Sequence, residues 1–192
     1  MKKSAVGLIA VSVLFLLFAA SQAAAQGANA SPAFKAPLLL TSAGQSPDGQ
    51  LAAILARRAG VEHTLSPMAT VDELAGVGSL GIVVGASLKG LGAAGIDTGK
   101  EKERVRALVT EATRRNIPVL FFHLGGDQRR GQLTDEMVTE YLPLAQWALI
   151  LKSGNFDGLF SRLAQEHNVP LHEVERTADG QEIVKAAFQP QG

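Results

Sequence analysis

The sequence contains no cysteine, which excludes disulfide bonds, thiolate catalysis and lipid attachment at a cysteine. A chain of 192 residues without disulfides must depend on its hydrophobic core for stability. One tryptophan and one tyrosine supply few aromatic surfaces on which bases or sugars could stack. Basic and acidic residues are equal at 18 each, so the sequence lacks the positive excess that is typical of nucleic-acid-binding proteins. We therefore expect no nucleic-acid partner.

Sequence signals for a metal or a cofactor are also missing. The histidines show no spacing typical of metal ligands, and we expect no metal site; they are His63, His123, His167 and His172. Residues Gly90–Gly95 match Gly-x-Gly-x-x-Gly, but residues 86–89 separate them from the preceding strand, and the next strand ends in His123 instead of an acidic residue. No Gly-Lys-Ser/Thr of a P-loop follows. We expect no cofactor, and these glycines either bring backbone N–H groups to an anion or shape a long turn.

The amino-terminal residues have the pattern of an export signal. Lys2 and Lys3 precede the apolar stretch Val6–Ala20, and Ala23–Ala25 supplies the small residues that a signal peptidase recognises. A retained membrane anchor is the less favoured alternative, because the apolar stretch is short for a span of about 20 residues. We expect a periplasmic or secreted protein without a membrane span after cleavage. The predicted parts of the chain are a signal peptide (1–25), a flexible tether (26–36) and a single domain (37–188).

Strand and helix patterns alternate along the predicted domain. Apolar runs predict strands, and apolar residues three or four positions apart predict the intervening helices. This alternation is typical of an α/β fold, and we expect a three-layer α/β/α sandwich with a doubly wound, mostly parallel sheet, Rossmann-like or flavodoxin-like. The expected strand order is 2-1-3-4-5, with a sixth strand at the edge. The predicted strands are Leu38–Thr41, Val61–Leu65, Gly81–Val84, Ile117–Leu124, Trp147–Leu151 and Leu171–Val174.

Several polar residues are expected to begin helices. Thr70 with Glu73, and Thr98 with Glu101, have the spacing of capping boxes. Asn155 is expected to cap the helix after the fifth strand, and from the same position its amide could also orient a ligand.

Each long apolar run ends in glycine together with hydroxyl groups, cations or an imidazole. In a parallel sheet these ends meet at one edge, and ligands bind at the topological switch point. We expect the loops after the first and third strands to face each other there across a crevice. The predicted ligand-binding residues are Thr41, Ser42, Gly44, Gln45, Ser46, Gly85, Ser87, Lys89, Gly90, Gly92, His123, Gly125, Gly126, Arg129, Arg130, Lys152 and Asn155.

The pair Arg129 and Arg130 follows the predicted strand Ile117–Leu124, which has the strongest strand pattern, and lies between glycines. Two guanidinium groups at this position could clamp a carboxylate or a phosphate. In the alternative, both are solvated and one pairs with Asp127 or Asp135. The clamp favours reversible binding of a small anionic solute, with Lys89 adding positive charge. A single domain lacks the second lobe of ordinary solute receptors, so a homodimer or a transporter partner is expected to close the site.

Two other functions stay open at this point. A serine hydrolase would use Ser42, Ser46 or Ser87 as nucleophile and His123 as base, with Asp127 or Asp157 orienting the imidazole. The sequence around these serines lacks the second glycine of the nucleophile elbow, and the hydroxyls could equally cap helices. A protein-interaction module would instead present an exposed apolar patch.

Four segments together resemble a family of small exported bacterial proteins known as domain of unknown function 6305. The resemblance spans nearly the whole predicted mature chain, and it implies export and a compact α/β domain. It implies no activity. The segments are Leu38–Ser46 (LLLTSAGQS), Lys89–Asp97 (KGLGAAGID), Gly125–Gly131 (GGDQRRG) and Gly154–Phe160 (GNFDGLF).

Overall fold

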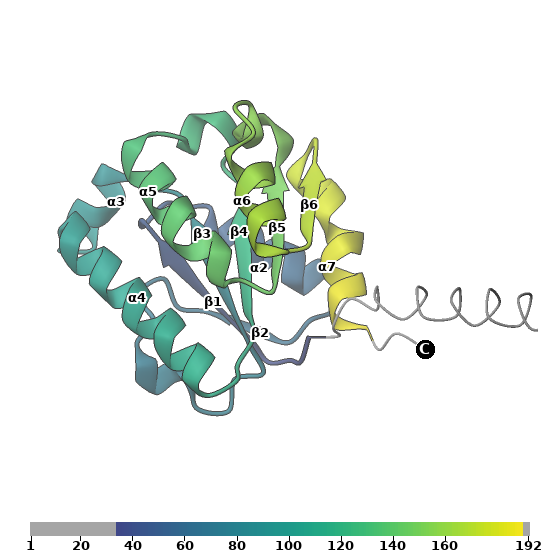
Figure 1. Cartoon of the computed structure of the whole chain (residues 1–192). Helices are drawn as coiled ribbons and strands as arrows, with labels where there is room; N and C mark the ends of the chain where they lie inside the picture. The colour runs from purple at the N-terminus through teal and green to yellow at the C-terminus, as the bar shows by residue number, and fades with distance from the viewer. Residues whose placement is uncertain (1–33, 190–192) are drawn as a thin grey trace, which may run out of the picture. The chain divides into compact units, whose positions relative to one another are not determined.

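The computed structural model describes residues 34–189. These residues form one parallel sheet with the strand order β2-β1-β3-β4-β5-β6 (Figure 1). The predicted signal peptide, and the predicted tether up to residue 33, lie outside the described residues. The strands are β1 (Leu38–Ala43), β2 (His63–Leu65), β3 (Ser79–Val84), β4 (Val119–His123), β5 (Trp147–Leu151) and β6 (Leu171–Val174).

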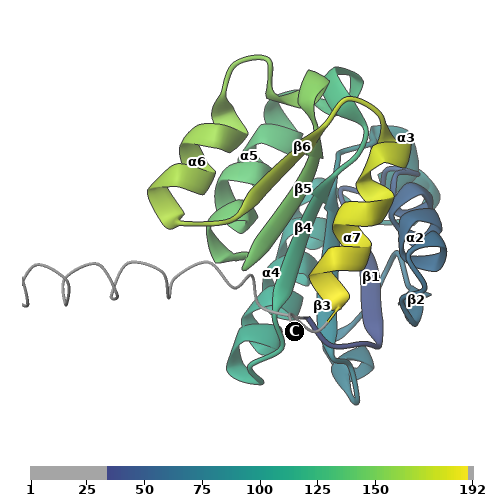
Figure 2. The same ribbon diagram turned by 90° about the vertical axis from the view of Figure 1, so that its right-hand side faces the viewer.

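Helices cover both faces of the sheet, which confirms the predicted three-layer α/β fold (Figure 2). Side chains of a strand alternate between its two faces, so each strand contributes to two separate cores. Leu38 and Leu40 pack in the core beneath α2 and α7, whereas Leu39 packs in the core beneath α4, α5 and α6. The helices are α2 (Gly49–Arg58), α3 (Leu88–Ala93), α4 (Thr98–Arg114), α5 (Gln132–Tyr141), α6 (Leu159–His167) and α7 (Gly180–Phe188).

Strand order and direction place a topological switch point between β1 and β3. From β1 the chain runs through α2 to β2 on one side, and from β3 it runs through α4 to β4 on the other. The loops after β1 and β3 therefore leave the sheet side by side, in opposite directions. We call the edge at which the strands end the carboxyl edge, and the opposite edge the amino edge.

Short 3₁₀ turns begin several of the connections at the carboxyl edge. Two of them, η2 (Gly126–Arg129) after β4 and η4 (Lys152–Asn155) after β5, contact each other. The remaining turns are η1 (Val71–Leu74), η3 (Leu142–Leu144) and η5 (Thr177–Asp179).

Three elements differ from the sequence-based expectation. Residues Leu88–Ala93 form α3, so part of the expected glycine-rich loop is helical. Helix α7 was not expected, and it places Val184 and Ala187 in the core that it shares with α2. Helix α4 is capped by Asp97, whose Oδ1 accepts a hydrogen bond of 2.8 Å from the Lys100 amide, and not by a Thr98–Glu101 capping box. Glu101 is turned away from the cap into the protein.

Candidate functional site

The loops that follow β1 and β3 pack directly against each other at the carboxyl edge. Gln45 and Ala86 form an antiparallel bridge, and a Cβ added to Gly44 would lie 2.6 Å from the Gly85 carbonyl oxygen. Gly44 has a φ of 107°, a conformation that glycine adopts without strain. The expected meeting of these loops is therefore present, but backbone fills much of the space between them.

A buried ion pair between Glu101 and Arg104 holds the β1 loop on α4. Glu101 is fully buried and accepts hydrogen bonds from the Gly44 amide (2.8 Å) and the Gln45 side chain (3.0 Å). The guanidinium of Arg104 lies 2.9 Å from the other carboxylate oxygen of Glu101 and also donates to Thr41 Oγ1. The hydrogen bonds of this ion pair all go to other groups of the protein, so the role of the pair is structural. The sequence does not predict this pair, because Glu101 is interpreted there as part of a capping box.

Most of the glycines and hydroxyl groups in the expected loops have structural roles, either in hydrogen bonds to backbone groups or in close backbone packing. Ser87 caps α3 by accepting a hydrogen bond of 3.1 Å from the Gly90 amide. Gly90 packs against the Gln45 carbonyl, where no side chain fits, while Gly92 faces open space. Ser42 Oγ donates to the Ser46 carbonyl at 3.3 Å. These observations favour the structural interpretation of the Gly-x-Gly-x-x-Gly string.

Asp48 is the exception, because one oxygen of its buried carboxylate has no donor among the described residues. It occupies the N-cap position of α2, where aspartate commonly accepts a hydrogen bond from the first turn, yet its side chain makes no cap hydrogen bond. The side chain is only 8% exposed, and Oδ2 has no hydrogen-bond partner. A Cβ added to Gly85 would lie 3.1 Å from both this oxygen and Ser46 Oγ, and one added to Gly125 would collide with the same oxygen.

The structure separates the two members of the expected arginine clamp. The Arg130 side chain is 4% exposed, and its guanidinium lies 2.6 Å from Asp135 and 2.7 Å from Asp157. Hydrogen bonds from Arg130, first to Asp157 and then to Asp135, raise the pKa of Arg130 above its ordinary value. The same guanidinium donates to the Gly154 carbonyl and stacks on Phe156 and Phe160. Arg130 therefore links the end of η2 to the start of α5 and to the connection between β5 and α6. Its guanidinium is not available to an anion.

Arg129 points the other way, toward Asp48. Its Nε lies 3.6 Å from Asp48 Oδ2, which is an ion pair but too long for a hydrogen bond. The side chain is 32% exposed, and within residues 34–189 its guanidinium makes no hydrogen bond. Arg129 is thus a cation at the carboxyl edge with its donors largely unused.

Two other expected ligand residues at this edge are engaged by acidic or polar neighbours. Lys152 lies 2.6 Å from Glu175, which raises the pKa of the lysine. Asn155 accepts a hydrogen bond of 3.0 Å from the Phe160 amide, and its side-chain amide donates to Ser161 and Glu173. The N-cap residue of α6 is Gly158, so Asn155 does not occupy the expected cap position, although its Oδ1 satisfies an amide of the first turn. Lys89 is exposed on α3 and forms no ion pair with the described residues.

His123 is completely buried, and among the described residues it makes no hydrogen bond to a serine hydroxyl. Its Nδ1 lies 2.9 Å from the Val84 carbonyl, and its Nε2 lies 3.0 Å from the Gly126 carbonyl. Burial lowers the pKa of the imidazole, and the carbonyl contacts oppose this shift. The hydroxyl of Ser46 accepts from the Asp48 amide at 3.3 Å. The described residues therefore contain no serine–histidine hydrogen bond of the kind that activates a nucleophile.

The two carboxylates that were expected to orient a catalytic imidazole, Asp127 and Asp157, make no hydrogen bond to His123 in the described chain. Asp157 is bonded to Arg130, which lowers the pKa of the carboxyl group to about 2. Asp127 is exposed and makes no side-chain hydrogen bond within the described chain. Neither carboxylate contacts the ring of His123, whose nitrogens face backbone carbonyls.

The sequence profile of a family described as "Domain of unknown function (DUF6305)" matches residues 35–188. The chain belongs to the DUF6305 family. This match confirms the family resemblance seen in the sequence, and it brings no activity with it. No curated protein matches the chain.

Two solved structures show weak likeness to the DUF6305 chain. AlinE4, described as an SGNH-hydrolase family esterase, is 13% identical, covering 76% of this chain and 79% of its own, with a TM-score of 0.31. A Schiff-base-forming fructose-1,6-bisphosphate aldolase is 12% identical, covering 79% of this chain and 91% of its own, with a TM-score of 0.32. These TM-scores are too low for either likeness to bear on function.

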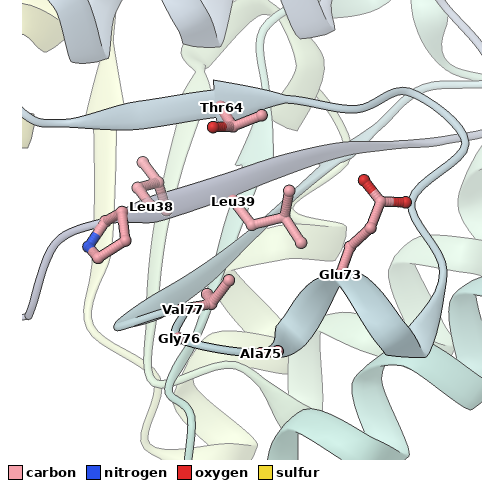
Figure 3. Close-up of a pocket in the computed structure, with 8 residues that line it drawn as sticks. Leu38, Leu39, Thr64, Glu73, Ala75, Gly76 and Val77 are labelled. Carbon is pink, nitrogen blue, oxygen red and sulfur yellow. The ribbon is translucent and has the colours of Figure 1, made fainter.

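Two cavities of the DUF6305 domain lie away from the carboxyl edge. One, of about 260 Å³, lies at the amino edge beside the start of β1 and is lined by Leu38, Leu39, Thr64 and residues 75–77, with the Glu73 carboxylate at its rim (Figure 3). Glu73 already accepts a hydrogen bond of 2.9 Å from the Thr70 amide. The other, of about 340 Å³, lies between the end of α2 and the end of α7. Neither cavity contains one of the expected ligand residues.

Residues 34–189 contain neither a candidate metal cluster nor a helix that could span a membrane. No cluster of three or more histidines and acidic residues that could hold a metal ion occurs there. None of the described helices has the length and apolar character needed to cross a membrane. Three large apolar side chains are exposed, those of Leu88, Leu144 and Phe156, and Phe156 lies against the guanidinium of Arg130.

Proposed function

We propose that this domain reversibly binds a small solute that carries an anionic group, and that Arg129 binds this group at the carboxyl edge. The observation that carries the proposal is that the hydrogen-bond donors of Arg129 are unused within the described chain. Its guanidinium lies 3.6 Å from a buried carboxylate, makes no hydrogen bond within the described chain and is one-third exposed. A guanidinium with unused planar donors is suited to bidentate binding of a carboxylate or a phosphate.

The surroundings of Arg129 support binding at one cation and not at two. Arg130, Arg104 and Lys152 each have a carboxylate partner within 3 Å, so their charges are already neutralised. We therefore propose a ligand with a single anionic group in contact with the protein. Binding is favoured over hydrolysis because both nitrogens of His123 face carbonyl oxygens and no serine hydroxyl.

The cellular setting of this binding is part of the proposal. The amino-terminal pattern of Lys2, Lys3 and the apolar stretch Val6–Ala20 favours export, so the solute would be one found in the periplasm or outside the cell. A homodimer or a transporter component, placed over the carboxyl edge, would complete the enclosure of a ligand that one domain leaves open.

Calorimetric titration of the purified protein with sodium salts of small carboxylates and phosphates, at fixed ionic strength, tests the proposal. When unfolding is measured in the presence of a bound ligand at about 100 times its Kd, the free energy of unfolding should be higher by about 2.7 kcal/mol. Arg129→Gln should abolish the binding of every anion that the natural protein binds. The matched control is Arg162→Gln, because Arg162 is exposed on α6 and forms no ion pair within the described chain. Anion binding that survives Arg129→Gln, or that is equally weakened by Arg162→Gln, contradicts the proposal.

A further inference from the structure

The structure points to a more specific ligand class, and this inference rests on the proposed function above. We infer that the ligand is a small monocarboxylate with a hydroxyl or amino group next to the carboxylate. Arg129 binds the carboxylate of this ligand, and Asp48 accepts a hydrogen bond from its hydroxyl or amino group. The two protein groups are adjacent, with 3.6 Å between Arg129 Nε and Asp48 Oδ2.

The need for a donor on the ligand comes from Asp48. A buried carboxylate oxygen without a hydrogen-bond partner is costly, and protein interiors rarely contain one. Asp48 Oδ2 is in this state although the amides of the first turn of α2 are close in sequence, so the side chain is held away from the helix cap. The nearest cation does not satisfy it, because 3.6 Å exceeds the usual N–H···O distance of about 2.7–3.2 Å.

Two glycines pack closely against Asp48. Gly85 and Gly125, at the ends of β3 and β4, lie so close that a Cβ on either would press on the Asp48 carboxylate or on Arg129. Ser46 Oγ lies on the same side of Gly85 as Asp48 Oδ2, so a hydroxyl group adjoins the carboxylate. The Arg129 side chain beside this group is one-third exposed and is held to Asp48 only by a long ion pair.

Asp48 also limits which anion can bind beside it. A phosphate dianion held by Arg129 would lie close to a second negative group, and like charges in a partly buried place repel strongly. A carboxylate carries half this charge. An adjacent hydroxyl or ammonium group turns the repulsion into a hydrogen bond, so an α-hydroxy or α-amino carboxylate matches the two protein groups in charge and in its donor and acceptor groups. The other titratable groups near the site are Arg130, which is bonded to Asp157, and His123, whose nitrogens face backbone carbonyls.

Three ligands with the same three-carbon carboxylate skeleton test this inference by isothermal calorimetry: propionate, L-lactate and L-alanine. In the natural protein we expect lactate or alanine to bind at least tenfold more tightly than propionate. A preference for lactate identifies a hydroxyl donor, and a preference for alanine identifies an ammonium donor. Equal affinities for all three would overturn the inference and leave the proposed function intact. Failure of all three to bind while another small anion binds through Arg129 would also overturn the inference alone. Failure of every carboxylate and phosphate tested, or binding that Arg129→Gln leaves unchanged, would count against the proposed function.

Substitution of Asp48 gives the second arm of the experiment. Asp48→Asn keeps the side-chain shape and should reduce the preference over propionate to less than twofold, while propionate itself still binds. The control is Asp72→Asn, because Asp72 is exposed in η1 and its side chain makes no hydrogen bond. Should Asp48→Asn fail to fold, the comparison of the three ligands on the natural protein still decides the question. A preference that persists in folded Asp48→Asn overturns the assigned role of this residue.

Discussion

Asp48 and Glu101 are both buried carboxylates at the carboxyl edge, and their surroundings are opposite. Glu101 receives donors from two loop groups and from Arg104, so each of its oxygens has a partner. Asp48 receives no hydrogen bond at Oδ2. A carboxylate whose oxygens are all satisfied by the protein has no free acceptor for a ligand, whereas Asp48 Oδ2 keeps an acceptor that a ligand donor could use. This contrast separates a structural residue from a candidate binding residue.

Removal of Glu101 should be strongly destabilising. Glu101→Ala leaves Arg104 without its carboxylate and leaves the Gly44 amide without an acceptor. Breaking a buried ion pair from one side costs about 3–5 kcal/mol. We expect a loss of this size in the free energy of unfolding measured with urea.

The matched control for this change is Glu103→Ala on the same helix. Glu103 is exposed and forms no ion pair within residues 34–189, so its removal should leave the urea midpoint nearly unchanged. Equal effects of the two substitutions would show that the Glu101 network contributes no special stability.

The sequence could predict that polar residues gather at the carboxyl edge, but not how they pair. Arg129 and Arg130 are neighbours with identical chemistry, and their order along the chain does not reveal that one faces Asp48 and the other Asp135 and Asp157. These partners lie on other elements, up to 81 positions away in the sequence as printed. Asp48 itself escaped notice because aspartate before a helix normally indicates a cap.

At the scale of single elements, α3 shows that spacing of glycines does not determine their role. Gly90 and Gly92 are both helical, and only Gly90 packs against another segment. Helix α3 is short and contains two of the poorest helix formers, which is why the sequence pattern predicted a loop there. Helix α7 was missed for a different reason, since its helix-forming residues follow a weak edge strand near the end of the domain.

Alanine substitutions at these two glycines should have opposite effects on stability. Gly92→Ala adds a Cβ in open space and restricts the unfolded chain, so it should raise the free energy of unfolding by about 0.5–1 kcal/mol. Gly90→Ala forces a Cβ against the Gln45 backbone and should lower it by about 1–3 kcal/mol. Urea unfolding of both variants measures the difference. A stabilising Gly90→Ala would mean that the β1 loop can move away from α3 at no cost.

For the whole molecule, alternation of strand and helix patterns was sufficient to predict the layers. The edge strand β6 and the strand order were confirmed, and the bounds of β5 and β6 agree with those predicted. β1 extends to Ala43, beyond the predicted end, because Ser42 and Ala43 pair with Val83 and Val84. Long-range pairing of this kind decides where a strand ends, and local sequence patterns do not contain it.

A buried histidine, His123, and a half-buried one, His172, should make the stability of the whole domain depend on pH. Burial lowers the pKa of His123 and of His172 from the ordinary value of 6.5, and Nε2 of His172 has no hydrogen-bond partner. As the pH falls through 6.5, the unfolded chain binds more protons than the folded chain, so the free energy of unfolding must decrease. Above this pH both states are neutral at these positions, and the dependence should disappear.

Urea unfolding between about pH 7 and about pH 5 measures this dependence. His172→Gln should reduce the slope, because the unfolded variant no longer gains a proton at this position. His167→Gln is the control, since His167 is exposed at the end of α6 and its removal should leave the slope as it is. A free energy of unfolding that does not change over this range, or an equal slope in natural protein and His172→Gln, would show that the protein accepts a charge beside Trp147 in its folded state.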